Sequence, residues 1–427
     1  MSQLRPLALA LAVPVLLASA CDGTTPTEAD VPPGPDLSLG GVHEQVAQGY
    51  TDFGFQAFRS LAQEEPEENI FFSGTSLAFA LAMPYHGADG ETRGEMARML
   101  GVEGLDLEEF NSSNQAWLDA LLEGTGETEL SIANSVWARA GFPFEVDFLE
   151  RNETYYRAVV ESVDFDDPAT VDRINRWVSD ETNGRIEEIV EEIDPLDIMF
   201  LINAIHFLGE WTTPFPEEST SPRPFTVPDG SREDVPTMTL RDTLHYHHSE
   251  EEGYEAVRLP YGEDERFAMY VFLPERESDL QAFYRDLDAA EWERRLGALS
   301  PTDVELRLPR FTLEYEKELI ATLKGLGMER AFDSEAADFT PMTQARDDVH
   351  ISQVLQKSFV QVNETGTEAA AVTSVTVSVT SAPAHPIMSV DRPFFFAIRD
   401  DETGTVLFQG QVIQPEDPNW DGTVEGG

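Results

Sequence analysis

The chain has 427 residues, of which 41% are hydrophobic and 10% aromatic, so it can bury a large core and is not intrinsically disordered. Asp and Glu number 80 against 28 Lys and Arg, which gives a formal net charge of 28 − 80 = −52. A surface this acidic repels nucleic acids and anionic membrane surfaces, so we predict no nucleic-acid partner.

The N-terminus has the pattern of a lipoprotein signal. Residues 1–20 combine a basic Arg5 with a 14-residue apolar stretch, Leu7–Ala20, too short for a membrane span and suited to a cleaved signal peptide. The following Ala-Ser-Ala-Cys ends at Cys21 and resembles a bacterial lipobox, in which the cysteine is lipidated. Ala stands where Leu is commoner, so an ordinary signal with a stray cysteine stays open. The chain has no second cysteine, and no intramolecular disulfide can form.

Residues 21–42 and 416–427 flank the predicted folded body. The first segment carries the lipidated cysteine and a polar, Pro- and Gly-rich stretch typical of flexible tethers, and the second is an acidic tail. Residues 43–415 contain no further linker and are predicted to be one domain. We therefore expect a secreted protein, held by its lipid at the membrane in the periplasm or at the cell surface.

Helices are predicted mostly in the first half of this body and strands in the second, which indicates an α+β fold. Apolar residues recur at helical spacing in Val42–Ala62, Ser76–Tyr85, Ala169–Ile189 and Glu316–Gly327. Strand patterns cover Phe267–Pro274, Val304–Pro309 and Val406–Val412.

No catalytic motif is present. The sequence lacks a G-x-S-x-G elbow, an H-E-x-x-H pair, a Walker A loop and a G-x-G-x-x-G loop. His245, His247 and His248 form a cluster beside Glu250–Glu252, where a metal site is the minor alternative to a solvated strand surface. We predict no enzyme activity, no cofactor and no metal.

Thr367–Thr380 has the period-2 pattern of a long strand with one buried face. One alternate set runs from small residues to valines: Thr367, Ala369, Ala371, Thr373, Val375, Val377 and Val379. The segment would span roughly 45 Å as a strand, and burying its three valines would contribute at most roughly 5–9 kcal/mol. Periodicity does not decide whether this strand is always in a sheet or enters one later.

This segment resembles the hinge and reactive-centre loop of serpins, and a series of short motifs resembles the same family in the same order. These motifs are Asn69–Ser76, Ala80–Met83, Gly87–Thr92, Ile174–Val178, Thr182–Ile186, Leu201–Trp211, Leu259–Tyr261, Leu308–Phe311, Leu326–Met328, Ala337–Phe339, Asp391–Phe396 and Leu407–Gly410.

The resemblance implies a serpin fold, with three β-sheets, about eight or nine helices and an exposed loop at about residues 364–390. It also implies a monomeric suicide inhibitor: a serine protease cuts the loop, forms a covalent acyl-enzyme, and is trapped when the cut loop enters the central sheet. A serpin-fold surface lipoprotein that binds without inhibiting is the alternative. The membrane is a partner through the lipid only.

The resemblance also assigns site residues. The hinge comprises Glu364, Gly366, Thr367, Glu368, Ala369, Ala370, Ala371, Val372 and Thr373, and the insertion gate comprises Trp211, Arg310, Ser73, Ser76, Asn203 and Gln356. Glu364 is expected to pair with Arg310 near Trp211, and Gly366 to give the hinge backbone freedom. Two residues depart from the family: Gly74 replaces a usual Pro, and Gln356 replaces a frequent His.

The usual loop length places the cleaved bond at Thr380–Ser381. Val379–Thr380 and Ser381–Ala382 stay open, because the return to Pro393 is longer than in common serpins. Small residues here suit elastase-like or subtilisin-like proteases. Trypsin-like targets are disfavoured, since no Lys or Arg lies between Lys357 and Arg392.

Overall fold

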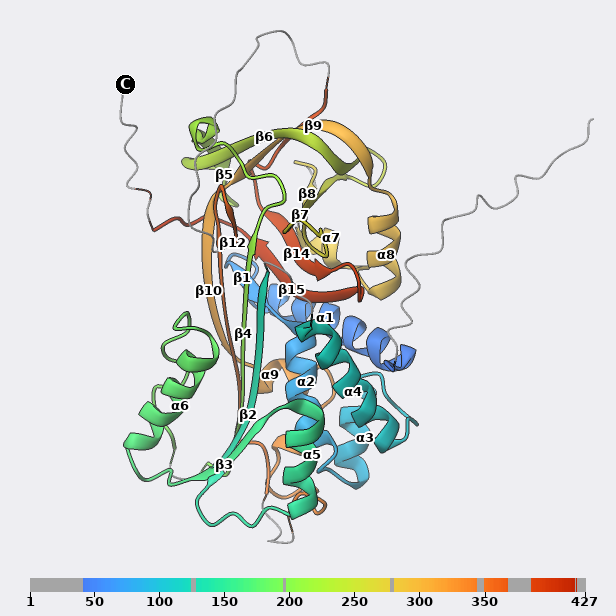
Figure 1. Cartoon of the computed structure of the whole chain (residues 1–427), viewed down its shortest axis with the longest axis vertical. Coiled ribbons are helices and arrows are strands. Elements are labelled where there is room, and N and C mark those ends of the chain that lie inside the picture. The colour runs from blue at the N-terminus through green and yellow to red at the C-terminus, as the bar shows by residue number, and fades with distance from the viewer. Residues whose placement is uncertain are drawn as a thin grey trace, which may run out of the picture. The chain divides into compact units, whose positions relative to one another are not determined.

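The structure is a computed structural model (Figure 1) that describes residues 41–123, 128–194, 197–276, 280–343, 349–367, 385–418 and 420. They fall within a single unit, Leu37–Gly427. No helix in these ranges is long and apolar enough to cross a membrane. Helices and strands mix as expected, and the α+β prediction is confirmed.

The described ranges contain nine α-helices and two short 3-10 helices. The α-helices are α1 (Glu44–Glu64), α2 (Gly74–Tyr85), α3 (Gly90–Met99), α4 (Leu107–Leu122), α5 (Val146–Tyr156), α6 (Ala169–Glu181), α7 (Leu280–Tyr284), α8 (Ala289–Gly297) and α9 (Ile320–Gly325). The 3-10 helices are η1 (Glu217–Ser219) and η2 (Arg330–Phe332). Every residue of α2 is buried, because this apolar helix runs through the core, and Ser73 caps its first turn.

The strands form two sheets. The six-stranded sheet has the order β10 (Phe311–Glu318), β11 (Gln353–Val362), β12 (Gly366–Thr367), β4 (Met199–Glu210), β2 (Glu129–Arg139) and β3 (Val159–Val163). The nine-stranded sheet has the order β1 (Ile70–Phe72), β15 (Thr405–Val412), β14 (Phe394–Asp400), β8 (Phe267–Pro274), β7 (Tyr254–Pro260), β6 (Arg232–Ser249), β9 (Ser300–Pro309) and β13 (Ile387–Ser389), with β5 (Ser221–Thr226) paired to β6.

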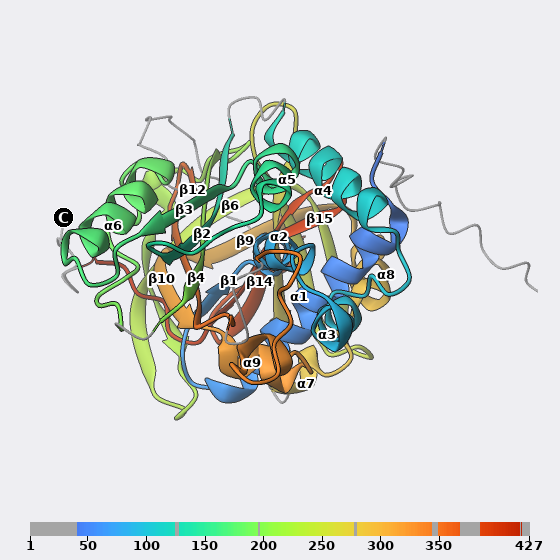
Figure 2. The ribbon, with the colours of Figure 1, turned by 90° about the horizontal axis from the view of Figure 1, so that it is seen from below.

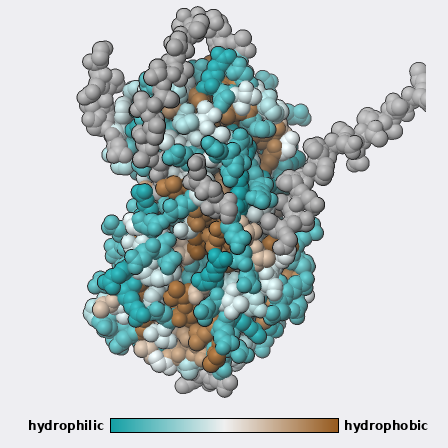
Figure 3. Space-filling view, in the orientation of Figure 1, coloured by the Kyte–Doolittle hydropathy of each residue, from teal (hydrophilic) through white to brown (hydrophobic). Residues whose placement is uncertain are grey.

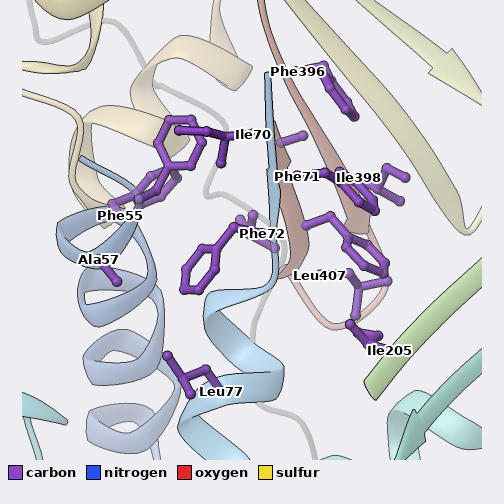
Figure 4. Packing of buried hydrophobic residues seen from close by; sticks show 14 of the residues in the cluster. Phe55, Ala57, Ile70, Phe71, Phe72, Leu77, Ile205, Phe396, Ile398 and Leu407 are labelled. Carbon is purple, nitrogen blue, oxygen red and sulfur yellow. The ribbon is translucent and has the colours of Figure 1, made fainter. Parts of the chain in front are cut away.

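Two apolar clusters lie on the two faces of the six-stranded sheet. The larger packs this sheet against α1, α2 and the nine-stranded sheet, and Figure 4 shows Phe71, Phe72 and Leu77 within it. The smaller cluster lies under α6, which covers the other face (Figure 2). Hydrophilic residues cover most of the face in Figure 3, and Val146 is the large hydrophobic residue exposed within the described ranges. The core therefore buries β4 on both sides.

Three details differ from the sequence predictions. Hydrogen bonding gives two sheets rather than three, because the 18-residue β6 pairs with β5, β9 and β7 along its length and joins their strands. Helix α6 ends at Glu181, not Ile189, since Asn183 and Gly184 adopt positive φ. The helix predicted for Glu316–Gly327 is α9 alone, because its first residues pair with β11 as the end of β10.

Candidate functional site

The start of the predicted loop lies inside the six-stranded sheet. Strands β11 and β4 pair directly, in parallel, over Gln353–Ser358 and Phe200–Ile205. Beyond that point the short β12 lies between them, with Thr367 opposite both Val362 of β11 and Gly209 of β4. The sheet is thus closed at one end and already parted by the hinge at the other.

Gly366 fits this position because it lacks a side chain. A Cβ atom there would lie 2.1 Å from the carbonyl oxygen of Gly209 and 2.7 Å from Cα of Glu210. The backbone freedom expected of Gly366 is not what selects glycine here, because Gly366 is not among the glycines with positive φ. Close approach to β4 is therefore what requires glycine here.

Backbone and side-chain contacts hold the residues before β12. The indole Nε1 of Trp211 donates to the carbonyl of Asn363 at 2.9 Å, and its backbone N–H donates to the carbonyl of Thr365 at 2.8 Å. Glu364 lies 3.5 Å from Arg310 and accepts a 2.6 Å hydrogen bond from the hydroxyl of Thr220. The expected Glu364–Arg310 pair is therefore present, and it lies beside Trp211. We call these three residues the entrance to the parted sheet.

Tyr261 closes the apolar side of this entrance. Its hydroxyl lies 2.7 Å from Oγ1 of Thr367, and its ring stacks on Trp211 with centroids 4.5 Å apart. Burial raises the pKa of the Tyr261 phenol well above its usual value, so the group stays neutral and keeps its hydrogen bond. Tyr261 fell within a family motif, but the sequence did not reveal this contact.

The C-terminal segment also reaches the entrance. Asp417 accepts hydrogen bonds from Nε of Arg310, at 2.8 Å, and from its Nη2. The backbone N–H of Thr312, in β10, donates to the carbonyl of Glu416 at 2.6 Å. Arg310 is thus shared between two carboxylates, and with Glu364 and Asp417 it lines a cavity of about 520 Å³.

A buried polar cluster lies where β11 and β4 still pair. Oε1 of Gln356 accepts from the backbone N–H of Ser73 at 3.0 Å, and its Nε2 donates to the Ser73 carbonyl at 3.0 Å and to Oδ1 of Asn203 at 2.6 Å. Asn203 in turn donates to the hydroxyl of Ser76 at 2.5 Å and to Asn134 at 2.7 Å. Gln356 therefore saturates its amide here, and the cluster ties the seam of the sheet to α2.

Two buried polar residues at this seam were missed from the sequence. Asn134 of β2 takes part in the Asn203 bond, and the hydroxyl of Ser358 donates to the carbonyl of Phe71. Both residues are buried, and each interrupts the alternate, core-facing set of its strand: Asn134 lies between Ile132 and Val136, and Ser358 precedes Val360. Such a polar residue within a buried alternate set is the signal that could have found them.

Gly74, the other departure from the family, has a packing role. A Cβ at Gly74 would lie 2.3 Å from Cα of Gly54 in α1. Two glycines therefore let α1 and α2 approach closely, at the start of the helix that carries Ser76.

Several predicted residues lie outside the described ranges: Cys21, the hinge residues Glu368–Thr373, and the candidate bonds within Val379–Ala382. The His cluster lies on β6, where Nε2 of His247 is 3.2 Å from Glu252. No group of metal-binding side chains was found in the part of the chain that the structure describes.

Comparisons with known proteins fit this geometry. A family model described as serpin (serine protease inhibitor) matches residues 48–415. Plasminogen activator inhibitor 1 of Neovison vison is 34% identical over 391 residues, covering 89% of this chain and 96% of that protein. The native-state structure of the thermophilic serpin tengpin has a TM-score of 0.80 and 32% identity, covering 87% of this chain and 95% of that one. Human thyroxine-binding globulin complexed with thyroxine has a TM-score of 0.80 and 28% identity, covering 87% and 99%.

Proposed function

The chain belongs to the serpin family, and we propose that it is a suicide inhibitor of extracellular serine proteases. The observation that carries this proposal is the position of Gly366 and Thr367 between β4 and β11. A strand that has begun to enter a parallel pair is poised to continue, once its other end is released. The small residues that follow Thr367 in the entering set support such continuation.

In the proposed reaction the protease serine Oγ attacks the carbonyl carbon of Thr380. The bond from that carbon to the nitrogen of Ser381 breaks, Ser381 leaves with a new amino terminus, and Thr380 stays joined to the protease as an ester. The freed segment then extends β12 and displaces the direct pairing of Gln353–Ser358 with β4. Main-chain hydrogen bonds and buried valines favour the inserted state.

The target class follows from the loop sequence. Thr380, or Val379 or Ser381 in the alternative registers, presents a small side chain to the primary specificity pocket. Such residues suit elastase-like or subtilisin-like proteases, whose pockets are small or shallow, and no basic residue lies between Lys357 and Arg392.

The proposal extends to location. The signal-like N-terminus and Cys21 support a secreted lipoprotein that acts as a monomer on a tether. Radiolabelled palmitate should enter the chain, and Cys21→Ser should abolish the label. Labelling that survives this change would refute the anchor at Cys21.

Incubation with pancreatic elastase or subtilisin tests the inhibitory function. We expect a complex that survives SDS and a released peptide that begins at Ser381, identified by mass spectrometry. Thr380→Arg should redirect complex formation to trypsin, which serves as the control for the bond. Complete cleavage without any complex, with every protease tried, would favour a binding protein instead.

A further inference from the structure

Three arginines gather on the outward face of strands near the far end of the loop. Arg223 lies on β5, Arg241 on β6 and Arg307 on β9, and we call these residues the arginine patch. Strand β13, which follows the loop, pairs with β9 so that Ser389 lies opposite Arg307. Figure 1 shows β5, β6 and β9 together at the top of the view. The patch therefore lies beside the strand through which the loop rejoins the sheet.

The patch has more positive charge than its own carboxylates neutralise. Arg241 holds Asp303 through two hydrogen bonds, of 3.0 and 2.8 Å. Arg307 holds Glu305 at 2.8 and 2.5 Å. Arg223 forms no ion pair with any described residue, and Glu305, the carboxylate that acts on it, is already held by Arg307.

Two buried donor groups in this region also lack a hydrogen-bond partner among the described residues. They are Nε of Arg223 and the hydroxyl of Thr239. Thr239 lies on β6 opposite Arg307, and Nε2 of His385 is 3.6 Å from Glu305. Unmet buried donors of this kind cost stability unless a ligand satisfies them.

Electrostatics support the same interpretation. Burial, and to a lesser extent the neighbouring charge of Arg307, lower the pKa of Arg223, and the nearby Glu305 opposes this only in part. A guanidinium that is partly desolvated beside a second guanidinium gains most from an incoming carboxylate, which can accept two N–H groups at once. The cluster is thus built for an anion.

We propose that the arginine patch receives a surface carboxylate of the attacking protease. The inference rests on the proposed function. His385 is five residues beyond Thr380 in the sequence, so a protease that grips the loop is brought close to this face. The chain as a whole, at −52, repels any acidic protease, and a local positive patch beside the loop offsets that repulsion and orients the encounter.

The test compares Arg223→Gln with Arg176→Gln. Arg176 is an exposed arginine of α6 that forms no ion pair with any described residue, so the two variants change charge equally. The probe is subtilisin, either unmodified or succinylated on its lysines to make it acidic. The second-order rate of loss of the intact loop is measured at low and high NaCl.

We expect Arg223→Gln to slow attack by succinylated subtilisin by about 3- to 10-fold at low salt, and to have no effect at high salt. Arg176→Gln should change the rate by less than about twofold. Thr239→Val removes one of the unpaired donors. It should also slow attack by succinylated subtilisin at low salt, without lowering Tm.

Equal slowing by the two arginine variants, or none by Arg223→Gln, would overturn the proposal. Loss of the intact loop is counted whether or not a covalent complex forms. A failure to trap the protease would therefore refute the proposed function, but the attack rates of the two arginine variants could still be compared.

Discussion

Replacing Gly366 by alanine should expel the hinge from the six-stranded sheet. The added Cβ would lie 2.1 Å from the carbonyl oxygen of Gly209, so β12 or β4 must shift by more than an ångström. Overpacking of this kind typically costs about 1–3 kcal/mol, which changes the ratio of inserted to expelled hinge roughly 5- to 150-fold. Expulsion also breaks the bond between Tyr261 and Thr367.

Trp211 reports on this change, because its indole bonds to the backbone beside the hinge. Its emission should shift to longer wavelength in Gly366→Ala, with Trp211→Phe as the reference that identifies its signal. The same clash persists after cleavage, when Gly366 must stay in the sheet, so the rise in Tm on loop cleavage should shrink. Gly297→Ala, where a Cβ meets nothing within 4 Å, is the matched control.

A Gly366→Ala protein with unchanged Trp211 emission and an unchanged rise in Tm on cleavage would contradict this prediction. That result would mean that the backbone at the hinge accommodates a side chain, and that close approach to β4 does not select glycine.

Three further predictions concern the supporting structure. Gly74→Ala should lower Tm, because its Cβ would overlap Cα of Gly54 and cost about 1–3 kcal/mol; an unchanged Tm would show that α1 and α2 can separate. Gln356→Leu should lower the free energy of unfolding by roughly 3 kcal/mol, because buried partners such as Asn203 lose their hydrogen bonds. Gln356→His should lower it less, since an imidazole can form some of these bonds. Equal Tm values for the two variants would contradict this prediction. Burial lowers the pKa of His86 from 6.5 to about 4, so the unfolded chain binds the proton more tightly than the folded protein does. The free energy of unfolding should therefore fall as the pH drops from about 6.5 toward 4, by up to roughly 3 kcal/mol. In His86→Phe the plot of Tm against pH should be flatter across that range, and parallel plots would contradict the assignment.

The family resemblance, more than local periodicity, assigned the residues of the site. The alternation after Thr367 predicts a strand with small leading residues; its residues from Glu368 onward lie outside the described ranges, so this stays a prediction. The entrance residues Trp211, Arg310 and Glu364 do meet in space. These three residues meet because they lie just beyond or between the long strands β4, β9, β10 and β11, whose pairing fixes where each strand ends.

The misses share a physical cause, namely contacts between distant residues. Asp417 binds Arg310 across 107 positions, and nothing local distinguishes it among 80 acidic residues. The end of β10 was predicted as helix because its charged residues suit a helix surface; pairing with β11 overrides that propensity. Gly366 was assigned to the hinge from the sequence, but the sequence did not show why glycine is needed there. The reason is the close approach of Gly366 to Gly209 of β4, which only the folded structure shows.

Thermal unfolding before and after loop cleavage tests the central claim most directly. The chain is nicked once in the loop by a catalytic amount of subtilisin, the protease is removed, and both forms are heated. If the loop inserts between β4 and β11, burial of its valines should raise Tm by roughly 10 °C or more, and Trp211 should report the change. An unchanged or lower Tm in the nicked chain would contradict insertion, and with it the inhibitory mechanism.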